Sequence, residues 1–145
     1  MKIVIMTAIA ALALAGPAFA DGHATSDAAA GADTFGKCKA CHSIVDDAGE
    51  IILRGGRNGP NLYGIHNRTA GTVEEFRYGD SIVEAGAAGL VWTEEEFVGF
   101  VADPKGYLAE YLDDRRARSK MSFRLRDEQD VRDVWAYLVS VGPTE

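Results

Sequence analysis

The stretch Cys38-Lys39-Ala40-Cys41-His42 decides how this sequence is interpreted. On a helical turn, side chains at positions i and i+3 project to the same side, so both thiols can reach the two vinyl groups on one edge of a haem. The next residue, His42, is then placed to coordinate the iron, and the spacing is the known haem c attachment pattern. We therefore predict one haem c, bound covalently through Cys38 and Cys41, with His42 as an iron ligand.

Two other uses of paired cysteines compete with this interpretation. A thioredoxin-like redox pair follows a strand and precedes a helix, whereas this pair closes a predicted helix. Half of a zinc site would need two further ligands, and the sequence has no second cysteine pair. Two cysteines three residues apart are also too few and too close for a disulfide scaffold. Haem attachment is the better explanation.

The N-terminus has the layout of a secretory signal peptide. Lys2 supplies a positive charge, residues 3–15 are almost entirely apolar, and Ala18-Phe19-Ala20 is a small-x-small cleavage site. The apolar run is shorter than the roughly 20 residues that span a bilayer. We expect cleavage after Ala20, a short flexible tail over residues 21–26, and a soluble periplasmic haem domain over residues 27–145. An uncleaved membrane anchor is the alternative.

The composition fits one small acidic domain. The chain has 15 basic and 22 acidic residues, a net charge of −7, and loss of Lys2 with the signal peptide makes this −8. The residues that remain are enough for a single hydrophobic core. A net negative charge argues against nucleic acid or an anionic membrane surface as the main partner. We expect a monomer that binds no nucleic acid.

Helical signals dominate the rest of the chain and predict an all-α, loop-rich domain. Apolar periodicity, a capping box at Thr93–Glu96 and the turn at Asp103-Pro104 mark the elements. The glycine-rich composition of residues 46–61 predicts a loop. The predicted helices run from Ser26 or Asp27 through Cys41, from Asp80 to the region of Gly86 and Gly89, from Thr93 to Asp103, from Pro104 through Leu112, and from near Asp127 to Gly142.

Met121 is the best candidate for the second iron ligand. Met1 and Met6 lie in the predicted signal peptide, so Met121 is the one methionine left after cleavage. Its polar neighbours suit a loop better than a core, and His/Met ligation gives the raised potential that electron transfer uses. A second histidine, either His23 or His66, is the alternative.

Covering a haem needs apolar bulk, and burying its propionates needs polar donors. Arg68, Tyr78 and the indole N–H of Trp92 are the candidate donors. An ordinary aromatic core would use the same kinds of residue. The aromatic residues that could cover the haem are Phe35, Trp92, Phe97, Phe100, Phe123, Trp135 and Tyr137.

Basic residues gather around the predicted iron ligands. Such a charge asymmetry in an acidic protein would orient docking to a partner, although charge runs are more often simply solvated. We expect a docking role. The basic residues are Lys37, Lys39, Arg115, Arg116, Arg118, Lys120, Arg124 and Arg126.

Taken in order, these motifs resemble a class I cytochrome c of the bacterial cytochrome c2 subgroup. The resemblance covers essentially all of residues 27–142. Beside the haem motif, it rests on residues 57–64 (Arg-Asn-Gly-Pro-Asn-Leu-Tyr-Gly), Ala70-Gly71-Thr72, Trp92, Lys120-Met121 and Trp135-Ala136-Tyr137-Leu138. It implies a small fold wrapped around one haem, with the first helix, bearing Gly31 and Phe35, crossing the last.

The resemblance also implies residue roles and partners. The carbonyl of Pro60 would accept the Nδ1 proton of His42, and Arg68, Tyr78 and Trp92 would contact the propionates. Members of this family carry single electrons, without enzymatic activity, from a cytochrome bc1 complex to a photosynthetic reaction centre or a terminal oxidase. Phe100 departs from the family pattern, because many relatives have a tyrosine there that hydrogen-bonds the methionine sulfur.

Three other functions compete with the electron carrier. A gas-binding protein or haem enzyme needs an open iron position, which a coordinating Met121 would close. A bacterial haem peroxidase would have two haem motifs, and this chain has one. A haem c subunit of a larger respiratory complex remains an alternative.

Overall fold

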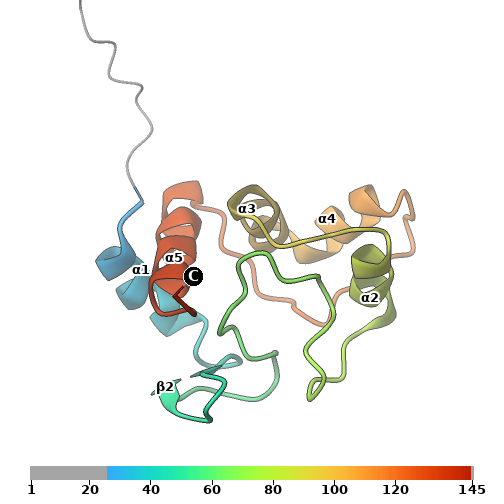
Figure 1. Cartoon of the computed structure of the whole chain (residues 1–145). Helices are drawn as coiled ribbons and strands as arrows, with labels where there is room; N and C mark the ends of the chain where they lie inside the picture. The colour runs from blue at the N-terminus through green and yellow to red at the C-terminus, as the bar shows by residue number, and fades with distance from the viewer. Residues whose placement is uncertain (1–25, 145) are drawn as a thin grey trace, which may run out of the picture.

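The computed structural model describes residues 26–144 and has a helical, loop-rich fold (Figure 1). The predicted signal peptide and residues 21–25 of the predicted tail lie outside the described residues. None of the helices within residues 26–144 is long and apolar enough to cross a membrane. The elements are α1 (Ala28–Thr34), the 3-10 helix η1 (Phe35–Lys37), β1 (Ile44–Val45), β2 (Ile51–Leu53), α2 (Asp80–Ala87), α3 (Glu94–Ala102), α4 (Pro104–Tyr111) and α5 (Glu128–Ser140).

Helices α2 to α5 begin where the sequence signals predict them. Thr93 caps α3, its hydroxyl accepting from the N–H of Glu96 at 3.4 Å. Asp103 ends α3, and its carboxylate accepts from the N–H of Gly106 at 3.2 Å, which caps α4. Asp127 caps α5 in the same way. Side chains at such positions satisfy N–H groups that lack a helical partner.

Two local predictions were wrong. The first α-helix ends at Thr34 rather than at Cys41, and the chain tightens into η1 and then a turn. Gly36, a poor helix former, lies in the tightened segment. Within the predicted loop 46–61, β2 pairs antiparallel with β1. Asp46 organises the connecting turn, because its carboxylate accepts from the N–H groups of residues 48 and 50 at 2.9 and 2.8 Å.

Helix α1 packs against α5, as the resemblance implies (Figure 1). Gly31 is buried there, and a Cβ at this position would lie 1.9 Å from the carbonyl oxygen of Asp133. Phe35 is fully buried, with its ring centroid 5.6 Å from that of Tyr137. The apolar residues that recur along α5 at helical spacing are buried, at Val131, Val134, Trp135 and Leu138. The absence of a side chain at residue 31 is what lets the two backbones meet.

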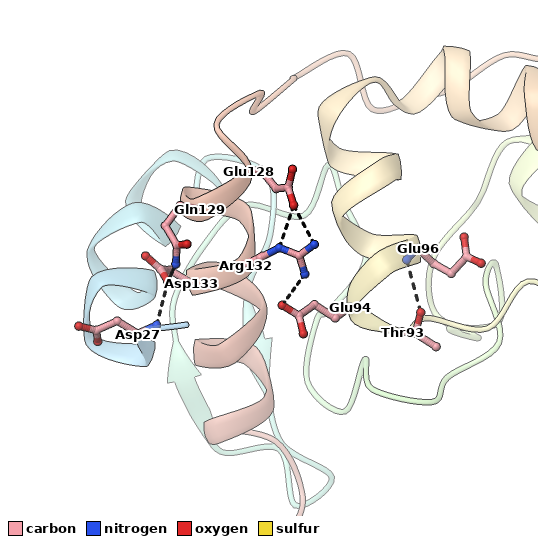
Figure 2. Close-up of polar contacts among 8 residues, drawn as sticks. All are labelled: Asp27, Thr93, Glu94, Glu96, Glu128, Gln129, Arg132 and Asp133. Carbon is pink, nitrogen blue, oxygen red and sulfur yellow. Dashed lines mark hydrogen bonds and ion pairs between the residues drawn. The ribbon is translucent and has the colours of Figure 1, made fainter. Parts of the chain in front are cut away.

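Polar contacts that the sequence analysis did not predict tie the helices together (Figure 2). The buried carboxylate of Asp133 accepts from the backbone N–H of Asp27 and from Nε2 of Gln129, both at 2.8 Å. The guanidinium of Arg132 pairs with Glu94 of α3 at 2.9 Å and with Glu128 at 2.8 Å. Helix α5 is thereby joined to both α1 and α3.

Candidate haem-binding site

The structure brings all eight predicted site residues to the lining of one cavity of about 280 Å³. They come from the turn after η1, from the loops around residues 58–79, from the segment before α3 and from the segment between α4 and α5. Apolar side chains from α3 and α5 complete the lining. The eight residues are Cys38, Cys41, His42, Pro60, Arg68, Tyr78, Trp92 and Met121.

The His42 imidazole is fixed for coordination through Nε2. Its Nδ1 lies 2.8 Å from the carbonyl oxygen of Pro60. Because a carbonyl cannot donate, the neutral ring must carry its proton on Nδ1, which leaves Nε2 with a free lone pair. Burial lowers the pKa of His42 and so favours this neutral form, although the Pro60 contact opposes the shift. The predicted contact of His42 with Pro60 is present.

Three glycines enclose the His42 turn. A Cβ on Gly59 would lie 2.3 Å from Cε1 of the His42 ring, so a larger residue there would displace the imidazole. A Cβ on Gly55 would lie 1.8 Å from the His42 carbonyl oxygen, and one on Gly56 would lie 2.1 Å from that of Ala40. The sequence predicted a glycine-rich loop over residues 46–61, but it did not predict that this loop packs closely against the His42 turn.

The two cysteines lie on one tight turn. The carbonyl of Cys38 accepts from the N–H groups of Cys41 and His42, both at 3.0 Å, so the helical spacing survives although the α-helix has ended. Cys38 is partly buried and Cys41 is exposed. Burial raises the pKa of the Cys38 thiol to about 11.

Met121 lies in the segment between α4 and α5 and is half-buried. Its backbone N–H donates to the hydroxyl of Ser119 at 3.1 Å. The alternative ligand His66 is exposed, packs edge-on against Trp135, and is not among the cavity-lining residues. His23 lies outside the described residues. The geometry thus favours the thioether over His66 as the second ligand.

Arg68 and Tyr78 supply polar groups at the cavity. The guanidinium of Arg68 donates to the carbonyls of Tyr63 at 2.9 Å and Asn61 at 3.2 Å, which uses two of its five N–H donors. Burial lowers the pKa of Arg68 and raises that of Tyr78, while the attraction between the cation and the phenol opposes both shifts. The remaining donors suit an anionic group such as a propionate.

The aromatic residues divide into two groups. Trp92, Phe97 and Phe100 are buried and line the cavity, together with the 40% exposed Phe123. The other three predicted residues do not line the cavity: Phe35 packs against Tyr137 of α5, and Trp135 packs against Phe97 of α3. Sequence analysis assigned no aliphatic residue to the cavity; the aliphatic lining includes Leu62, Ile65, Ile82, Leu125, Val131 and Val134.

This donor set fits a haem. An apolar cavity holds an imidazole with a free Nε2, a thioether, two thiols on one turn and a buried guanidinium with unused donors. Imidazole and thioether are ligands of the iron in electron-transfer cytochromes, and the thiols can form thioethers with vinyl groups.

No protein-family model matches the chain, but individual proteins do. Cytochrome c-551 of Roseobacter denitrificans is 54% identical over 128 residues, 88% of this chain and 87% of that protein. Cytochrome c2 of Rhodobacter capsulatus is 51% identical over 142 residues, 97% and 98% of the two chains. The crystal structure of Rhodobacter sphaeroides cytochrome c2 matches with a TM-score of 0.80 and 48% identity, over 83% of this chain and 99% of that one. The chain belongs to the cytochrome c2 family.

Membership of the cytochrome c2 family establishes the general function and the cofactor of the chain. Cytochromes c are electron-transfer proteins with one covalently bound haem c, so the chain is an electron carrier rather than an enzyme and haem c is its cofactor. The class I fold expected from the sequence resemblance is confirmed by the structural match.

Phe100 should tune the potential of this cytochrome. Its ring is buried and lines the cavity with Met121. If Met121 ligates the iron, a hydroxyl in Phe100→Tyr that donates to the sulfur would withdraw electron density and weaken the sulfur as a ligand to ferric iron, so the reduction potential should rise. We expect a rise below about 60 mV, because one hydrogen bond nets about 0.5–1.5 kcal/mol. Voltammetry at fixed pH measures it; an unchanged or lower potential would contradict the prediction.

Proposed function

We propose that the chain is a soluble periplasmic single-electron carrier whose haem c is attached through Cys38 and Cys41 and ligated by His42 and Met121. The observation that carries this proposal is the convergence of these four residues on one cavity. They come from two segments about 80 residues apart in sequence, so the fold has to bring them together. If His42 and Met121 both bind the iron, it has no free position for a substrate, which suits transfer of electrons alone.

The composition of the cavity lining suits a haem whose iron changes oxidation state in an apolar environment. Side chains such as Leu62, Phe97 and Val134 make its lining largely apolar. Arg68, Tyr78 and Trp92 would meet the propionates, so the charged edge of the group has donors while its face lies against hydrocarbon.

Secretion and maturation complete the proposal. We infer cleavage after Ala20, leaving a monomer that begins at Asp21. The intact mass should therefore equal residues 21–145 plus one haem, and the colour should stay with the chain after acid-acetone extraction. Cys38→Ala and Cys41→Ala should each leave one thioether, whereas the double variant should lose haem on extraction. Extraction of haem from the unmodified protein would contradict covalent attachment.

The proposed partners are membrane electron-transfer complexes, with a bc1-type donor and a reaction centre or terminal oxidase as acceptor. Lys37, Arg118 and Lys120 line the cavity and would mark the docking face at the haem edge. Ion pairs reduce the field of some of the predicted basic residues: Lys37 pairs with Asp130, Arg116 with Asp114 and Arg124 with Asp103. Docking would then depend most on Arg118 and Lys120, the cavity-lining cations that form no ion pair within residues 26–144.

Association with an acidic partner surface should weaken steeply as salt rises, because exposed charges are screened beyond about 10 Å at 0.1 M ionic strength. Lys120→Glu, at an exposed position that lines the cavity, should lower the association rate roughly tenfold at low salt. Glu95→Lys, at an exposed position on α3, is the distant control and should change the rate much less. Stopped-flow electron transfer measures both; rates independent of salt would argue against steering.

A further inference from the structure

The segment that carries Met121 has no regular structure of its own. Residues 113–124 contain neither helix nor strand, so neighbouring elements must hold them in place. Helix α3 holds the C-terminal end: the N–H of Leu125 donates to the carbonyl of Val101 at 3.1 Å, and Arg124 pairs with Asp103 at 2.9 Å. These contacts restrain residues 124 and 125, so the residues around Met121 need other contacts to hold them in place.

Residues 77–81 provide that second attachment. The backbone N–H of Arg118 donates to the hydroxyl of Ser81, the second residue of α2, at 3.0 Å. The Lys120 ammonium donates to the carbonyl of Arg77 at 2.6 Å. Both contacts lie within three residues of Met121 in sequence. They join the Met121 segment to the part of the chain that enters α2.

The two contacts differ in what they hold. Lys120 reaches its partner through a long side chain with several free rotations, so its contact restrains the backbone only weakly. The Ser81 hydroxyl has a single side-chain rotation and sits on a helix, and its partner is a backbone N–H. The neighbouring Gly79 and Ile82 line the same cavity as Met121. The Ser81 bond therefore fixes the separation of two walls of that cavity.

We propose that Ser81 is a positioning residue for the Met121 ligand. Its hydroxyl accepts from the N–H of Arg118, holds residues 118–121 against α2 and so favours the closed, thioether-ligated form. This inference rests on the proposed function, because it takes Met121 as the second ligand. Loss of the hydroxyl should let the segment open more often without changing the ligands themselves.

Ser81→Ala tests this in the ferric holoprotein. Imidazole can bind only when the segment opens, so its affinity should rise about two- to tenfold, the change that follows from one net hydrogen bond. Titration is followed by the loss of the far-red sulfur-to-iron band. Exchange of the Arg118 amide hydrogen, measured by NMR without added ligand, should speed up by a similar factor. Ser81→Thr keeps the hydroxyl and should behave as the unmodified protein.

Ser140→Ala is the matched control, because the Ser140 hydroxyl donates to the carbonyl of Tyr137 at 2.7 Å on α5 and does not contact the Met121 segment. It should leave imidazole affinity unchanged. Equal affinities for Ser81→Ala and the unmodified protein, or an equal rise in Ser140→Ala, would overturn the role of Ser81. If the unmodified ferric protein lacked the far-red band, the proposed Met121 ligation would fail instead.

Discussion

Replacement of Met121 by alanine should abolish the far-red sulfur-to-iron band of the ferric protein and lower the reduction potential by on the order of 0.2 V. A thioether stabilises ferrous iron relative to ferric iron, so its loss favours the oxidised form. The remaining ligand, His42, keeps its hydrogen bond to Pro60 and should hold the haem in place. Visible spectroscopy and voltammetry at one pH measure the two effects.

His66→Ala is the control for this experiment. His66 is exposed and is not among the residues that line the cavity, so both band and potential should stay as they are. Loss of the band in His66→Ala, with its retention in Met121→Ala, would assign the second ligand to histidine.

Gly31→Ala should destabilise the holoprotein by about 3 kcal/mol, the upper end of the usual cost of overpacking. The added Cβ would lie 1.9 Å from the carbonyl oxygen of Asp133 and 2.4 Å from its carbon, and backbone atoms cannot turn aside as a side chain can. Helices α1 and α5 would have to separate, and the melting temperature should fall by roughly 10 °C. Thermal unfolding followed by circular dichroism measures the change.

Gly36→Ala provides the comparison in the same part of the chain. A Cβ at Gly36 meets no atom within 4 Å, and alanine restricts the unfolded chain more than glycine does. Its stability should be unchanged or slightly higher. Similar losses in both variants would mean that the close contact at Gly31 is not what sets the stability.

Local signals were enough to predict the later helices. Thr93, Asp103 and Asp127 cap helices whose N–H groups need acceptors close by in sequence, so a short window of residues contains the information. The hairpin was missed because β1 has only two residues, too few to show strand alternation. No local pattern predicts the burial of Asp133, because its carboxylate accepts from the backbone N–H of Asp27, 106 residues away.

The candidate site was predictable in its members but not in its arrangement. The cysteine spacing, the lone methionine left after the predicted cleavage and the polar donors each stood out by residue type, and all of them line the cavity. The guanidinium of Arg68 is oriented by two backbone carbonyls, and three glycines pack closely against the His42 turn. Both sets of contacts depend on the path that a loop takes through space. Sequence periodicity carries no information on such a path.

The contact between α1 and α5 also dictates the order in which the fold can form. Its hydrogen bond from Asp27 to Asp133 joins residues 106 positions apart, and closing a loop of that length costs about 4 kcal/mol of chain entropy. Helix α5 follows all the other described elements in the chain, so the buried face of α1 has no partner until α5 has been made. A chain truncated before α5 should therefore remain open.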